Sequence, residues 1–193
     1  MVVLLSIAMT GITKMVITTM DSQQKIDAEF RAQQDARQVE YDMEKILGEA
    51  KRLDAASHQY AEFRDDYVSV PNQNGGWTTY YYATPPGAIG PTIVRLITSS
   101  KPVYAPTLRT SDKQMINVMP NASNQSTTVE RINSGPIFTY YKSDGTQATF
   151  SGGKVQTPRD VRSILVNYRI TVSEGHTLKE PVNASTRINL RNY

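Results

Sequence analysis

The first fifty-odd residues constrain the fold most, because they predict one long helix with two kinds of surface. Residues 1–20 carry a single formal charge, that of Lys14, and their apolar side chains point in every direction, as in a helix surrounded by lipid or by other helices. No proline occurs before Pro71, so no residue of this kind interrupts the helix. Roughly fifty residues at about 1.5 Å each span about 75 Å, which is more than the width of a domain of this size. We therefore expect the helix to project from the rest of the chain.

The part expected to project is the apolar half, residues 1–20. It would lie in a bilayer, in a bundle of like helices, or in each in turn. It has neither a basic n-region nor an A-x-A site, so it does not read as a secretory signal peptide. Lys14 is expected to snorkel to a headgroup surface, which leaves Met1–Thr13 as a short, deeply apolar stretch. The residues assigned to this membrane or filament-core helix are Val2, Val3, Leu4, Leu5, Ile7, Ile12, Val16 and Ile17.

Residues 21–56 predict the amphipathic half of the helix, which is expected to end between Leu53 and Tyr60. Apolar residues recur here mostly three, four or seven positions apart and form one stripe on a polar rod. Oppositely charged neighbours such as Lys25 and Glu29 indicate that the other faces are solvated. The stripe is expected to pack on a β-sheet through Ile26, Phe30, Met43, Ile46, Leu47 and Leu53.

The remainder of the chain shows the period-two pattern of strands. Tyr67–Val70 and Trp77–Ala83 flank a turn-rich segment and predict a hairpin, and Thr92–Thr98 predicts a third strand. Ile164–Val172 and Val182–Leu190 alternate apolar and polar residues, so each is expected to bury one face. No second helical pattern of useful length separates these strands, which disfavours parallel βαβ units.

Two regions between these strands are less regular. In the middle of the chain, Thr107–Arg109 and Met115–Val118 are predicted as short strands, and 121–128 is predicted as a polar loop. Further on, Pro136–Lys142 and Gln147–Phe150 are expected to form a hairpin, because the Asp-Gly pair between them suits a tight turn.

These patterns together predict an α+β fold. A long N-terminal α-helix would pack by its C-terminal half on an antiparallel β-sheet with meander topology. The expected organisation has three parts: residues 1–20 as the transmembrane or filament-core half of the helix, 21–56 as its amphipathic half, and 57–193 as an antiparallel β globular domain.

The composition disfavours an enzyme and a nucleic-acid-binding protein. The net charge of +3 comes from scattered residues, without a basic cluster. The chain has no cysteine, and its two histidines, His58 and His176, lack the spacing of metal ligands. The Ser-Gly-Gly-Lys run at 151–154 departs from a phosphate loop and is expected to form a hairpin turn. We therefore assign no catalytic, cofactor-binding or metal-binding residue and expect no cofactor.

Several segments together resemble type IV pilin-like proteins, most closely minor pilins and the minor pseudopilins of type II secretion and competence systems. They are the apolar start VVLLSIAMTGI, the amphipathic continuation at 33–53, the segment PIFTYYKSDG, the strand DVRSILVNYRITV and the closing STRINLRNY. The family's basic leader, its glycine and the Phe-Thr-Leu-x-Glu type opening have no counterpart here. We expect that the start of the chain was cut, that it was assigned at an internal methionine, or that the chain is not a processed prepilin.

The resemblance implies a pilin-like fold and a non-catalytic structural subunit of a pilus-like filament or pseudopilus. Such a subunit waits in the cytoplasmic (inner) membrane as a single-pass protein with an extracytoplasmic globular domain, and then moves into an extracellular or periplasmic filament. Its partners would be other pilin or pseudopilin subunits, contacted through the N-terminal helix, and the membrane. Neither a small-molecule substrate nor nucleic acid is expected.

A second hypothesis is a membrane-tethered extracytoplasmic module for binding or adhesion. It would bind DNA, a surface or another ligand, and a ligand-binding module would need a pocket. A basic or aromatic face on the sheet domain that binds DNA or a surface would instead make the chain a functionalised minor pilin. Titration of the soluble fragment with DNA at two salt concentrations separates these interpretations, because phosphate contacts weaken steeply with salt.

Overall fold

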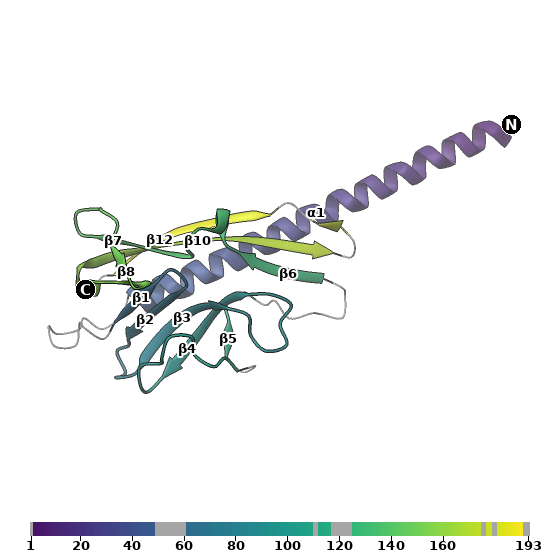
Figure 1. Ribbon diagram of the computed structural model, residues 1–193. Coiled ribbons are helices and arrows are strands. Elements are labelled where there is room, and N and C mark those ends of the chain that lie inside the picture. Colours follow the sequence, from purple (N-terminus) through teal and green to yellow (C-terminus); the bar gives the residue numbers. More distant parts are fainter. Residues whose placement is uncertain are drawn as a thin grey trace.

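The structure, a computed structural model, has the predicted α+β composition (Figure 1). It describes residues 2–48, 61–109, 112–116, 125–174, 177–178 and 181–190. Within these ranges, one α-helix, α1 (Val2–Gly48), is followed by antiparallel strands in two five-stranded sheets and one two-stranded ribbon. The expected single meander is therefore wrong in part, because the strands divide between two sheets. The expected end of the helix after Leu53 lies outside the described residues.

The first sheet, here called sheet A, is a simple meander. The predicted hairpin and the strand that follows it form its centre, and every neighbouring pair is antiparallel. In the turn between Pro71 and Trp77, the Asn72 side-chain oxygen accepts hydrogen bonds from the backbone N–H groups of Asn74 and Gly76, each at 3.0 Å, which explains the tight turn there. In chain order its strands are β1 (Glu62–Arg64), β2 (Tyr67–Pro71), β3 (Trp77–Ala83), β4 (Thr92–Thr98) and β5 (Lys113–Gln114).

The second sheet, sheet B, is built around one long strand, β10 (Val161–Glu174). Its alternation of apolar and polar residues was the clearest strand signal, and its predicted antiparallel pairing with the last strand is confirmed. One edge of β10 pairs with β12 (Val182–Asn189) and β11 (Thr177–Leu178), and the other pairs with β6 (Gln125–Glu130) and β7 (Phe138–Lys142).

Three predictions for the middle of the chain are corrected. The polar loop expected at 121–128 is wrong from Gln125 onward, because β10 extends far enough to pair with Gln125–Glu130. The strand expected at Thr107–Arg109 is absent, and pairing with β4 falls at Lys113–Gln114, ahead of the predicted Met115–Val118. Residues 117–118 lie outside the described part of the chain.

The hairpin expected to pair β7 with Gln147–Phe150 is shorter than predicted. Tyr141 and Gln147 form one isolated bridge, and the chain then makes a separate ribbon of β8 (Phe150–Ser151) and β9 (Lys154–Val155). Gly152 and Gly153 in its turn have φ angles of 60° and 74°, which glycine adopts without steric cost. The predicted hairpin turn at 151–154 is thus confirmed. The described residues also contain two single-turn 3-10 helices, η2 (Ile132–Ser134) and η3 (Pro158–Asp160).

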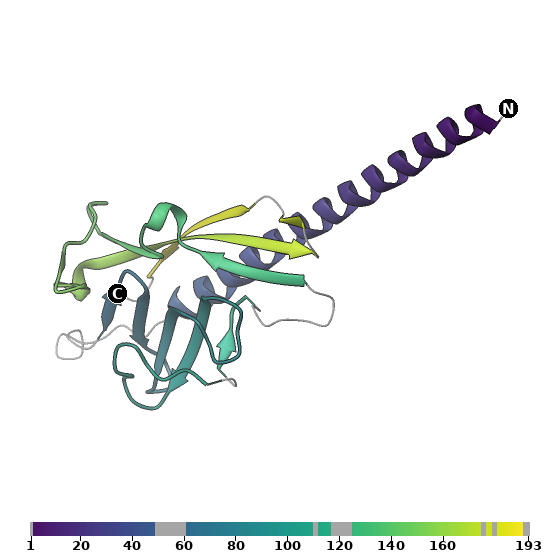
Figure 2. The same ribbon diagram turned by 45° about the vertical axis from the view of Figure 1, so that its right-hand side comes forward.

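The second half of α1 is seated on the sheets, whereas the first half projects (Figures 1 and 2). The helix contacts β10 and β12 most extensively. Its buried side is narrow and begins with small residues, which allow the helix to approach the sheet closely. The side chains buried there are Ala28, Ala32, Val39, Met43 and Leu47.

The predicted packing stripe is wrong at its N-terminal end. Ile26 and Phe30 are 64% and 66% exposed, and the residues two positions later, Ala28 and Ala32, are buried in their place. Two positions correspond to about 200° around a helix, so the large apolar side chains point away from the sheets. Met43 and Leu47 lie in the core, Ile46 is half-buried, and Leu53 lies outside the described residues.

Truncating the two faces of α1 should have unequal effects on stability. Leu47→Ala removes a fully buried side chain and should lower the free energy of unfolding by about 2–5 kcal/mol. Phe30→Ala removes an exposed side chain and should change it by less than about 0.5 kcal/mol. Urea denaturation of the two variants measures both values. Equal losses would mean that the helix is rotated relative to this structure.

Candidate functional site

The projecting part of α1 is the most unusual surface of the chain. Six large apolar side chains are exposed there, and at about 100° per residue they spread over more than half of the helix circumference. None of the other elements that the structure describes lies beside this part of the helix (Figure 2). We call these residues the apolar tip: Met9, Ile12, Met15, Val16, Ile17 and Met20.

Three of the residues predicted for the membrane or filament-core helix, Ile12, Val16 and Ile17, belong to the apolar tip. The other five lie in α1 by their backbone, and their side chains lie outside the described part of the structure: Val2, Val3, Leu4, Leu5 and Ile7. Among the residues whose side chains the structure does describe, no helix is both long and apolar enough to cross a membrane.

The hydroxyl groups near the apolar tip are hydrogen-bonded within the helix itself. Thr13, Thr18, Thr19 and Ser22 each donate to the carbonyl oxygen four residues earlier, at 2.8–2.9 Å. Such bonds satisfy a hydroxyl donor without water or a neighbouring chain. This part of the helix can therefore enter an apolar environment with these donors already paired.

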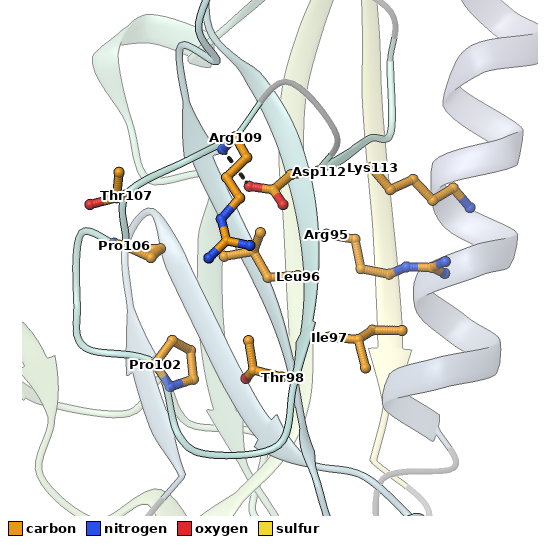
Figure 3. A pocket seen from close by; sticks show the side chains of 10 residues that line it. All are labelled: Arg95, Leu96, Ile97, Thr98, Pro102, Pro106, Thr107, Arg109, Asp112 and Lys113. Atoms are coloured by element: carbon orange, nitrogen blue, oxygen red, sulfur yellow. Dashed lines mark hydrogen bonds between the residues drawn. The ribbon is translucent and has the colours of Figure 1, made fainter.

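A single carboxylate on α1, that of Asp42, connects the helix to sheet A. Tyr80, Arg95 and Lys113 occupy neighbouring positions across β3, β4 and β5, so the sheet register places their side chains in one row. Arg95 and Lys113 extend from the sheet toward α1 (Figure 3). We call these four residues the Asp42 cluster.

The contacts within the Asp42 cluster are short. Arg95 Nη1 donates to both carboxylate oxygens of Asp42 at 2.6 and 2.8 Å, and Lys113 Nζ donates to Oδ1 at 3.1 Å. The Tyr80 hydroxyl donates to Oδ2 at 3.0 Å. Without the carboxylate, the cations of Arg95 and Lys113 would lie opposite each other and repel. Asp42 therefore compensates two charges of sheet A while fixing the rotation of the helix.

These contacts set the pKa values of the cluster. Burial alone would raise the pKa of Asp42, but the hydrogen bond from Lys113, the charge of Arg95 and the bond from Tyr80 together lower it. Burial, the charge of Asp42 and their hydrogen bond raise the pKa of Tyr80 far above its ordinary value. At neutral pH the cluster thus holds an ionised carboxylate and a neutral phenol.

Sheet B holds the same stretch of helix by two further polar contacts. Thr186 Oγ1 on β12 donates to Glu40 Oε1 at 2.6 Å, and the Tyr168 hydroxyl on β10 donates to the carbonyl oxygen of Ala36 at 3.4 Å. The two sheets therefore grip one segment of α1, from Ala36 to Asp42, from different sides.

A pocket of about 380 Å³ lies between β4 and the segment 99–109 (Figure 3). Three of its charged side chains already have partners. Arg95 and Lys113 bind Asp42, and the Asp112 carboxylate accepts the backbone N–H of Arg109 at 2.6 Å. These contacts give each of the three side chains a structural role, so their presence at the pocket does not indicate a ligand site.

The described part of the chain contains no group of three His, Asp or Glu side chains that could hold a metal ion. His58 and His176 lie outside the described residues. The acidic pair Asp65 and Asp66 contacts Arg131, with O···N distances of 2.9 and 3.8 Å. These two carboxylates therefore belong to an ion-pair network.

The sequence did not single out Asp42, although one signal was available. Asp42 directly precedes Met43 and lies three positions after Val39, so it borders the buried side of the helix. A charge at that position calls for a partner, because burying an unpaired carboxylate is costly. The partners Arg95 and Lys113 come from distant strands, and only the three-dimensional register identifies them.

No protein-family model matches this chain, and comparisons with curated proteins and with solved structures found no match either. The resemblance to pilin-like proteins accordingly stays a prediction.

Removing the carboxylate charge of Asp42 should weaken the attachment of α1 to sheet A. Asp42→Asn leaves Arg95 and Lys113 facing each other and should cost about 1.5–3 kcal/mol of unfolding free energy. Glu44→Gln is the matched control, because it neutralises an exposed carboxylate two positions further along α1. It should cost less than about 0.5 kcal/mol. Urea denaturation at pH 7 compares the two variants.

The same pair of proteins predicts a pH dependence. Because the pKa of Asp42 is lower in the folded than in the unfolded chain, its contribution is complete above the unfolded value of about 4 and is lost as the pH falls through the folded value. The stability difference between wild type and Asp42→Asn should therefore shrink as the pH falls from 6 to 3. A difference that stayed constant over this range would contradict the assignment of Asp42 as the charged centre of the cluster.

Proposed function

We propose that this chain is a structural subunit of a type IV pilin-like filament, of the minor pilin or pseudopilin kind. The observation that carries the proposal is the apolar tip, a projecting helix segment whose large side chains are exposed over more than half of its circumference. A sheet or a single groove covers a narrower stripe of a helix. Lipid, or several helices at once, can cover so broad a surface.

The paired hydroxyl groups support the same proposal. In lipid or in a dry helix bundle, an unpaired donor costs several kcal/mol. Thr13, Thr18, Thr19 and Ser22 avoid this cost through bonds to the carbonyl groups of their own helix. These four hydroxyl groups can thus pass from one apolar environment to another without new polar partners.

In the proposed cycle, the subunit waits in the cytoplasmic (inner) membrane with its two-sheet domain outside. Extraction transfers the N-terminal half of α1 from lipid into a bundle of like helices, forming an extracellular or periplasmic filament. Apolar burial is retained throughout, so the transfer need cost little free energy. The sheets stay bound to residues 36–42 of α1, so the globular domain moves together with the helix.

A charge placed within the apolar tip tests this proposal in the full chain. Val16→Asp should weaken partitioning into liposomes by about 3 kcal/mol, roughly a hundredfold, and should remove the chain from the sheared filament fraction of producing cells. Gln23→Asp adds the same charge beyond the tip, on the same helix, and should leave both properties unchanged. Both variants should keep the urea midpoint of the wild type, because both positions are exposed.

Deleting residues 1–20 should give a folded, soluble monomer that no longer enters filaments. The deletion removes the apolar tip and leaves the seat of the helix intact. Flotation with liposomes and analytical ultracentrifugation measure the outcome. Membrane association retained by this fragment would count directly against the proposal.

A further inference from the structure

The outer edge of β12 is open to pairing. The backbone N–H of Leu190 donates to the carbonyl of Arg162 on β10 at 2.9 Å, which fixes the alternation along the strand. The even-numbered residues of β12, like Leu190, direct their backbone N–H and C=O groups toward β10. Asn183, Ser185 and Arg187 direct theirs away from it, toward the open edge. Among the described residues none pairs with this outer edge, and both ribbon views place β12 at the border of sheet B (Figures 1 and 2).

The other described edges are short or covered. On sheet A the outer strands β1 and β5 have three and two residues. On sheet B the edge of β7 is covered by its own chain, since Ala148 donates to the carbonyl of Tyr140 at 2.8 Å. The edge of β6 receives the Tyr82 hydroxyl on the carbonyl of Val129 at 3.0 Å. β12, with eight residues, is the exception in this part of the chain.

Few of the devices that usually protect an edge strand occur in β12. Its register with β10 runs without a bulge from Asn189 to Val182, and the strand contains no lysine and no proline. The helix contacts β12 through the inward-facing side chains, where Thr186 donates to Glu40, and through the end of the strand, where a Cβ added to Gly48 would lie 3.8 Å from the carbonyl oxygen of Asn189. The stretch from Asn183 to Arg187 is therefore a template for another strand.

The surroundings of this edge indicate what kind of strand would fit. Arg187 is exposed on the solvent face, where its guanidinium donates to the Ser163 hydroxyl of β10 at 3.0 Å and lies 4.5 Å from the ring centre of Tyr141. Arg169 lies on the same face and donates to the Asn183 side chain at 3.1 Å. β12 itself carries no acidic residue. On the opposite face, Val182 and Ala184 are half-buried and small, so they would accept apolar side chains beside them.

We propose that the edge of β12 binds an extended, acidic segment of another polypeptide as an added strand. Backbone groups of Asn183, Ser185 and Arg187 would supply the hydrogen bonds, and glutamate or aspartate on the solvent face would pair with Arg187. A second copy of β12 is a poorer occupant, because it brings another arginine and no carboxylate. This inference goes beyond the proposed filament role and does not depend on it.

The test uses the full chain in detergent micelles and two synthetic peptides. In one, glutamate alternates with valine and threonine over eight residues; in the other, lysine replaces each glutamate. Amide hydrogen exchange followed by NMR should show that the glutamate peptide slows exchange at Asn183, Ser185 and Arg187 at least tenfold. The lysine peptide should bind at least tenfold more weakly.

Two variants link this binding to the edge. Ser185→Pro removes an outward N–H that the β10 ladder does not use, so the variant should fold and should bind the glutamate peptide at least tenfold more weakly. Arg187→Glu should reverse the preference in favour of the lysine peptide, which keeps the test decisive if the proline variant does not fold.

Three results would overturn the proposal. They are equal binding of the two peptides, binding that leaves the three outward amides unprotected, and protection of these amides that rises with protein concentration in the absence of peptide. The last result would identify a second copy of this chain as the occupant.

Discussion

The seat of α1 between the two sheets is the constraint on which the rest of the structure depends. Sheet B holds the helix closely, because Ala28 and Ala32 offer little bulk, and Met43 and Leu47 fill the core beneath it. Sheet A, which makes fewer close contacts with the helix, reaches Asp42 with the side chains of Arg95, Lys113 and Tyr80. Apolar packing on one side and a charge-compensated cluster on the other fix both the position and the rotation of the rod.

That fixed seat explains why one helix can have two very different halves. Where the sheets hold it, apolar side chains recur three or four positions apart among polar ones, and the helix is part of a folded domain. Beyond the seat, the side chains of the apolar tip are left outside any protein contact in the described structure. Exposed apolar surface of this extent marks an interaction site. The domain thus acts as a rigid holder that presents the tip, which is what the proposed assembly role requires.

How much of this the sequence predicts depends on the range of the interactions involved. The long helix, the hairpin after Tyr67 and the two alternating strands near the C-terminus follow from local periodicity, and the structure confirms them. The face of α1 that packs on the sheets does not follow from local periodicity. Ile26 and Phe30 carry the stronger hydrophobic signal, but the close approach of sheet B selects Ala28 and Ala32 for burial. The division into two sheets and the partners of Asp42 depend on long-range register, which no local pattern contains.

In this structure α1 is one continuous rod, and the sheets contact one side of its second half. Nitroxide labels placed one at a time along residues 9–47 of the full chain in lipid vesicles test this arrangement directly, through their collision rates with oxygen and with a water-soluble relaxation agent. Access to oxygen should be uniform from position 9 to 20 and should then vary with a period of about 3.6 residues, with minima at positions 28, 32, 39, 43 and 47. Periodic protection already present between positions 9 and 20, or access to the water-soluble agent throughout that stretch, would contradict it.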